Sequence, residues 1–131
     1  MGDARMGKVY DLAQLTEGNG IDTNLVKLFF FENKDYYNAL TEFLETFGRP
    51  LAHYTPAFVV NSPDDRALFM RDCLGIRTTL MRLGLTLAMR ELDIMENAAH
   101  AGNAKEFADG QIKFDAAVEI YCTVIKDALL Y

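Results

Sequence analysis

Apolar residues recur along residues 66–84 at the spacing of one face of a helix. Five of them follow one another at intervals of four, three, four and three: Phe69, Cys73, Ile76, Leu80 and Leu83. This period places all five on a single stripe, as in a helix that packs against a core. Ser62 can cap such a helix, Pro63 suits its first position, and Gly84 ends the pattern. The sequence therefore predicts a buried central helix over residues 63–83.

The back of this helix also carries apolar side chains. Met70, Leu74 and Met81 lie together on a second strip, with Arg77 and Thr78 beside it. One interpretation is a wider buried face under a neighbouring helix, and the other is a surface that docks another protein. We take these five residues as the candidate partner-binding site.

The same helical period occurs in five further segments. The predicted helices cover residues 8–16, 22–29, 33–54, 85–101 and 104–130. Gly48 and Pro50 are expected to bend the third of these, and Pro56 is expected to end it. Residues 57–60, AFVV, are the one strand-like segment, which is too short and isolated to found a sheet.

Long amphipathic helices joined by short turns predict an antiparallel up-down four-helix bundle. One or two short N-terminal helices would precede it. We therefore expect an all-α fold that forms a single domain over residues 1–131. The residues predicted to be buried in its core include Phe69, Cys73, Ile76, Leu80, Leu92, Val118 and Tyr121.

Composition narrows the possible classes of protein. Half of the residues are apolar and only three are proline, which favours a globular chain over a disordered one. The net charge is −6, with no concentrated basic surface of the kind that nucleic acid requires. No apolar run is long enough to span a membrane, and the first ten residues show no signal peptide. We expect a cytoplasmic protein with neither a nucleic-acid nor a membrane partner.

The residues that could carry chemistry are few and scattered. Cys73 and Cys122 each lie within an apolar helical pattern and form no C-x-x-C pair, so we expect reduced, buried thiols. Neither His53 nor His100 has the neighbours of a metal site. The chain has no glycine-rich phosphate loop and no G-x-S-x-G motif. The pattern therefore indicates no metal, no cofactor and no enzymatic activity.

Many residues follow the order found in bacterial histidine phosphotransfer (HPt) domains. In the first half these residues are Ile21, Asp22, Leu28, Phe29, Asn33, Asp35, Tyr36 or Tyr37, Leu40 and Phe43. In the second half they are Asp65, Phe69, Leu83, Gly84, Met95, Glu96, Ala101, Gly102 and Asn103. The chain from Ile21 onward thus resembles this family. The resemblance implies an up-down four-helix bundle that docks receiver domains of response regulators, or histidine kinases, through its central helix.

The central motif of the family is H-x-x-K-G, with a glycine about ten residues after the histidine. Counting back from Gly84 places Leu74 at the phosphorylated position, Arg77 at the lysine and Thr78 at the small glycine. Leucine has no nucleophilic or titratable atom, so phosphoryl relay through this position is chemically excluded. The chain resembles a degenerate member of the family, similar to plant pseudo-phosphotransfer proteins. Arg77 would supply a cation to the acidic pocket of a receiver domain.

Three functions remain open. The first is a non-catalytic binding module in two-component signalling, which docks a receiver domain or a kinase without accepting phosphate. The second is phosphotransfer through another residue, such as His53 or His100. The third is a structural or oligomerisation bundle that kept the fold and lost the signalling role. The sequence names neither the partner nor the oligomeric state.

Overall fold

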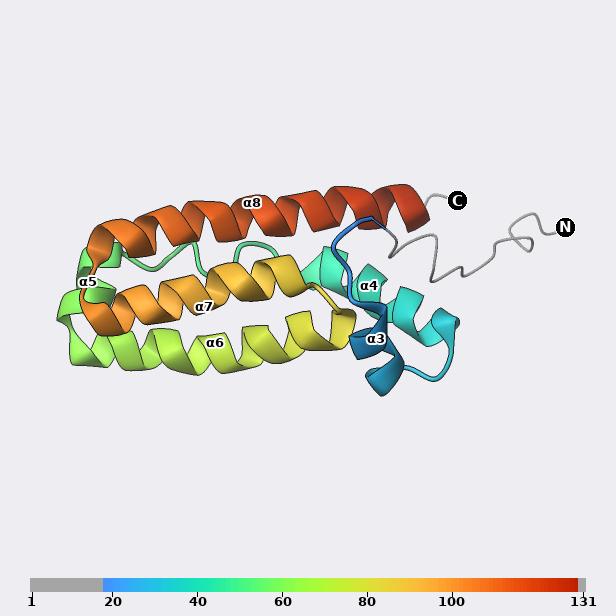
Figure 1. Ribbon diagram of the computed structural model, residues 1–131, viewed down its shortest axis with the longest axis horizontal. Coiled ribbons are helices and arrows are strands. Elements are labelled where there is room, and N and C mark those ends of the chain that lie inside the picture. The colour runs from blue at the N-terminus through green and yellow to red at the C-terminus, as the bar shows by residue number, and fades with distance from the viewer. Residues whose placement is uncertain (1–17, 130–131) are drawn as a thin grey trace, which may run out of the picture.

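The computed structural model describes residues 18–129, which are mostly helical (Figure 1). The helices described are α3 (Thr23–Phe29), α4 (Asn33–Thr46), α5 (Pro56–Asn61), α6 (Pro63–Leu83), α7 (Thr86–Ala101) and α8 (Ala104–Leu129). Over the same residues the only β contact is an isolated bridge between Ile21 and Leu85. The all-α prediction is confirmed. The helix expected over residues 8–16 lies outside the described residues.

Helix α6 begins and ends where the sequence predicts. Ser62 is its N-cap, and the side-chain oxygen accepts a hydrogen bond from the backbone N–H of Asp65 at 3.3 Å. Gly84 ends the helix in the left-handed region, with φ of 75°. A Cβ on this glycine would lie 2.7 Å from the carbonyl oxygen of Asp22. Glycine is required here both by the backbone conformation and by the close approach of the chain that leads into α3.

The core lies between the long helices. Figure 1 shows α6, α7 and α8 side by side along the long axis, and α4 packs against α6 and α8. All seven residues predicted for the core are buried. The hydroxyl of Tyr36 on α4 is buried as well, and it donates a hydrogen bond to the carbonyl oxygen of Leu83 at 2.8 Å. This bond ties α4 to the last turn of α6.

The segment between α4 and α6 differs from the sequence prediction. Helix α4 ends at Thr46, and Gly48 takes a positive φ of 58°, so the helix is not merely bent here. Pro56 begins α5 instead of ending a helix, and the AFVV segment that looks strand-like is helical. Proline suits the first position of a helix because its missing N–H would have no intrahelical partner there.

A loop over residues 47–55 takes the place of the missing helical turns. The side-chain amide of Gln111 on α8 donates to the backbone oxygens of Leu51 at 2.9 Å and Tyr54 at 2.8 Å. The ring of Tyr54 packs edge-on against Phe69, with 5.4 Å between the centroids. A polar residue interrupts the apolar stripe of α8 at Gln111 because the loop carbonyls need a donor at this position.

The core position of Leu80 leads to a first prediction. Leu80 is fully buried, so Leu80→Ala should lower the free energy of unfolding by roughly 2–5 kcal/mol. Leu74→Ala on the same helix is the matched control, and it should cost less than about 0.5 kcal/mol because Leu74 is exposed. Urea denaturation of the three proteins measures both values. If both substitutions lower the free energy of unfolding by the same amount, α6 is not oriented as described.

Candidate functional site

The candidate site lies on the side of α6 that faces away from its buried stripe. Leu74, at the middle of the helix, is 68% exposed, as the docking interpretation predicted. Thr78 lies one turn further on, is exposed, and donates its hydroxyl to the carbonyl oxygen of Leu74 at 2.9 Å. Gly75 is exposed beside Leu74, and a Cβ there would have no heavy atom within 4 Å. A leucine side chain therefore projects into solvent next to a bare stretch of helix backbone.

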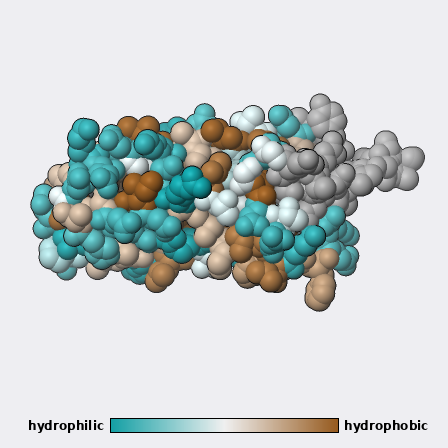
Figure 2. Space-filling view, viewed as in Figure 1, coloured by the Kyte–Doolittle hydropathy of each residue, from teal (hydrophilic) through white to brown (hydrophobic). Residues whose placement is uncertain are grey.

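Met70 and Met81 form the edges of this surface and are only partly exposed. Both are intermediate in burial, and Met70 packs against the core cluster. The strip Met70–Leu74–Met81 is therefore not continuously exposed, and its protruding centre is Leu74. On the face seen in Figure 2, hydrophobic residues likewise form separate patches among hydrophilic ones. The side chains of Met70 and Met81 are flexible and can adapt their shape to a neighbouring surface.

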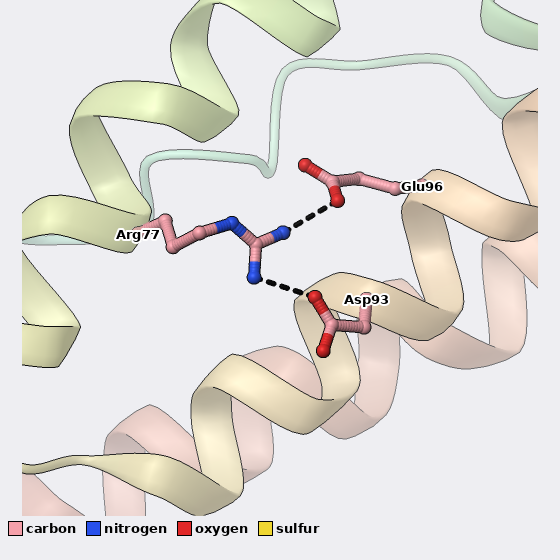
Figure 3. Close-up of polar contacts among 3 residues, drawn as sticks. All are labelled: Arg77, Asp93 and Glu96. Atoms are coloured by element: carbon pink, nitrogen blue, oxygen red, sulfur yellow. Dashed lines mark hydrogen bonds and ion pairs between the residues drawn. The ribbon is translucent and has the colours of Figure 1, made fainter.

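Arg77 points toward α7 and away from the exposed centre of the surface. Its guanidinium bridges two carboxylates, with Nη1 at 2.5 Å from Oδ1 of Asp93 and Nη2 at 2.5 Å from Oε1 of Glu96 (Figure 3). The two acids are three residues apart and so share one face of α7. Partial burial acts to lower the pKa of Arg77, but the hydrogen bonds and charges of Glu96 and Asp93 outweigh this effect and raise the pKa. The planar guanidinium thus clamps α6 to α7.

This geometry changes the role expected for Arg77. One cation lies between two anions, so the cluster carries an excess negative charge and presents no free positive charge to a partner. The exposed cation nearest to Leu74 along α6 is Arg71, whose side chain is 70% exposed and lies 3.7 Å from the carboxylate of Asp72. Arg71 precedes Leu74 by three residues, close to one helical turn, which brings both to the same surface.

The ion pairs of Arg77 with α7 were not predicted from the sequence, although the spacing of the residues around the α6–α7 turn indicates them. Helices α6 and α7 are joined by a tight turn at Gly84 and Leu85. Arg77 precedes Leu85 by eight residues, and Asp93 follows it by eight. Two antiparallel helices with such a short connection place residues at equal distances from the turn beside each other. The register of the hairpin could therefore have indicated the pair.

Helix α6 carries no histidine, and its cysteine is not available as a nucleophile. Cys73 is buried, and burial together with the charge of Glu96 raises the pKa of its thiol, which keeps it protonated. His53 is exposed, stacks on Tyr54 at 4.2 Å between ring centroids, and lines a pocket together with Arg71 and Asp72 of α6. His100 lies in the last turn of α7. Within residues 18–129, no three His, Cys, Asp or Glu side chains are grouped so that they could hold a metal ion.

Comparison with protein-family models, with curated proteins and with solved structures gives no match for this chain. Among the helices described, none combines the length and the apolar character needed to cross a bilayer. The role of the α6 surface therefore has to be inferred from its own residues and geometry.

The Arg77 clamp leads to a second prediction. Arg77→Met should lower the free energy of unfolding by roughly 1–2 kcal/mol, because it removes two charge-assisted hydrogen bonds and leaves two carboxylates side by side. Arg71→Met is the matched control on the exposed side of α6 and should cost less than about 0.5 kcal/mol. Urea denaturation at low and high salt measures the difference. If Arg77→Met costs no more than Arg71→Met, the guanidinium is not held by α7 and is available to a partner.

Proposed function

We propose that this chain is a non-catalytic, HPt-like binding module of two-component signalling. It docks a receiver domain or a histidine kinase through the outer face of α6 without accepting a phosphoryl group. The observation that carries this proposal is the exposure of Leu74. At the position where the residue order of HPt domains places the phosphorylated histidine, this helix presents a side chain that is 68% exposed and chemically inert.

The packing of the helices supports the proposal. Helix α4 contacts α6 and α8, and α7 contacts the same two helices, so the four longest helices described form a closed ring. An up-down four-helix bundle has this pattern of neighbours, and it is the architecture that the resemblance implies. The loop over residues 47–55 shortens one of the four helices but leaves the side of α6 that carries Leu74 uncovered.

The chemistry of the surface suits binding better than phosphate transfer. Leucine offers a partner an apolar anchor, and anchors of this kind contribute much of the energy of an interface. Gly75 and Thr78 beside it are small, so a partner can approach the helix backbone closely. Arg71, rather than the clamped Arg77, is placed to face the acidic pocket of a receiver domain.

A charge placed at Leu74 tests the docking face. Leu74→Asp should weaken the binding of a receiver domain from the same genome by about 1–3 kcal/mol, the scale of an interface anchor. Its melting temperature should stay close to that of the parent chain, because Leu74 is exposed. Ile112→Asp on α8 is the matched control, since Ile112 is 70% exposed and lies on another helix.

The two readouts separate the possible outcomes. Calorimetric titration measures affinity, and a thermal melt of each variant measures folding. If Leu74→Asp unfolds the protein, Leu74 belongs to the core and the docking face does not exist. If Ile112→Asp weakens binding as much as Leu74→Asp, the partner binds exposed apolar residues or responds to net charge without preference for α6.

The absence of a histidine on α6 gives a further prediction. Incubation with a labelled, phosphorylated receiver domain or kinase should leave no acid-labile phosphate on this chain, because Leu74 cannot form a phosphoramidate. Autoradiography with and without acid treatment measures the label. Label that is retained and then lost in His53→Ala or His100→Ala would instead favour phosphotransfer through that histidine.

A further inference from the structure

The end of α3 and the turn that follows it expose three large apolar side chains that are neighbours in the sequence. Leu28 is 75% exposed, Phe29 is 43% exposed and Phe31 is fully exposed. We call these three residues the apolar tip. Phe30 turns inward instead and packs on Tyr36, with 5.5 Å between the ring centroids. Clustered exposed apolar side chains usually mark a contact with another molecule.

A groove of about 360 Å³ lies between α4 and α6. Five apolar side chains of the core region contribute to its lining: Ala39, Phe43, Phe47, Ile76 and Leu83. Gly75 and Thr79 belong to its α6 side, and the lack of a side chain at Gly75 leaves that wall open. The groove has room for the ring of a phenylalanine and offers it aromatic and aliphatic neighbours.

Arg82 links the groove to Phe30, the residue between Phe29 and Phe31 of the apolar tip. Its guanidinium carbon lies 5.4 Å from the centroid of the Phe30 ring, and the same residue lines the groove. The tip therefore lies near the end of the groove, on one contiguous surface. A surface that combines a protruding apolar group with a neighbouring hollow is self-complementary. A two-fold dimer requires this property, because the same patch of each subunit meets the other.

The surrounding charges favour a second copy of the chain over a membrane. The exposed residues Lys27 and Lys34 flank the tip, and the groove is lined by one acidic residue, Glu42, and one basic residue, Arg82. In a two-fold arrangement, lysines of one subunit approach the glutamate of the other. Glu32 directly follows Phe31, so insertion of the tip into a bilayer would carry a carboxylate toward the headgroups and the apolar region.

We propose that two copies of this chain form a symmetric dimer in which Phe31 of each subunit inserts into the α4–α6 groove of the other. Leu28 and Phe29 then cover the rim of the groove. This interface uses residues of this chain alone and does not depend on the docking of a receiver domain. Dimerisation and receiver binding are measured separately, so the failure of one leaves the other intact.

The first experiment measures mass in solution by sedimentation velocity over a range of concentrations. The parent chain should show a concentration-dependent monomer–dimer equilibrium. Phe31→Ser should raise the dimer dissociation constant at least tenfold, whereas the control Ile112→Ser, at an exposed apolar position on α8, should leave it unchanged. A parent chain that remains monomeric at every concentration would overturn the proposal, and so would a dimer that both substitutions weaken equally.

A second variant acts on the groove instead of the tip. Gly75→Leu places a side chain where a Cβ meets no heavy atom within 4 Å, so it should fill the groove without disturbing the fold. It also removes a glycine from a helix interior, which should keep the melting temperature at or above that of the parent chain. The dimer should weaken as it does for Phe31→Ser.

Mixing the two variants distinguishes this geometry from any other dimer. Phe31→Ser keeps the groove and Gly75→Leu keeps the tip, so the mixture should restore one tip–groove contact and form heterodimers at concentrations where each variant alone is monomeric. Failure of the mixture to associate would overturn the reciprocal insertion. Sedimentation of the parent chain, but not of Phe31→Ser, with neutral phospholipid vesicles would assign the tip to a membrane and contradict the proposal.

Discussion

The apolar stripe of α6 has to be kept from water along its whole length, and the other described helices are placed where they cover it. Helix α7 packs against α6, and so do α3, α4 and α5. Near the first turns of α6, the rings of Tyr54 and Phe107 pack edge-on against Phe69 at 5.4 and 4.9 Å. Because these contacts fix the side of α6 that carries Phe69, the helical period places Leu74 on the opposite side, which is exposed to solvent.

The charges near α6 divide into those that hold the bundle together and those that a partner can meet. Arg77 is held by Asp93 and Glu96, so its contribution is to the register of α6 against α7. Arg71 is left on the outer face. Gly75 lies beside Leu74 and also lines the α4–α6 groove, so the proposed docking face and the proposed dimer contact adjoin on one helix.

The long helices could be predicted from sequence because their stripes and caps are local features. Ser62 and Gly84 mark both ends of α6, and the seven residues expected in the core are all buried. The segment over residues 47–61 could not be predicted, because its path depends on a left-handed Gly48 and on hydrogen bonds from Gln111, some sixty residues away in the chain.

The candidate site was predictable only in part. The exposure of Leu74 followed from helical period, but the partners of Arg77 lie on another helix and depend on the register of the hairpin. The exposure of individual side chains in the apolar run from Leu28 to Phe31 was not predicted from the sequence. In the structure only Phe30 turns inward, because the chain changes direction where α3 ends and consecutive side chains there point to different sides.

The central claim is that the outer face of α6 is the docking surface, and backbone amide NMR tests it most directly. The labelled chain would be titrated with a receiver domain from the same genome. We expect the largest shift changes at Leu74, Gly75 and Thr78, with Arg71 also affected and the amides around Ile112 on α8 unchanged. Shift changes centred on α8, or none at a saturating concentration of the receiver domain, would contradict the claim.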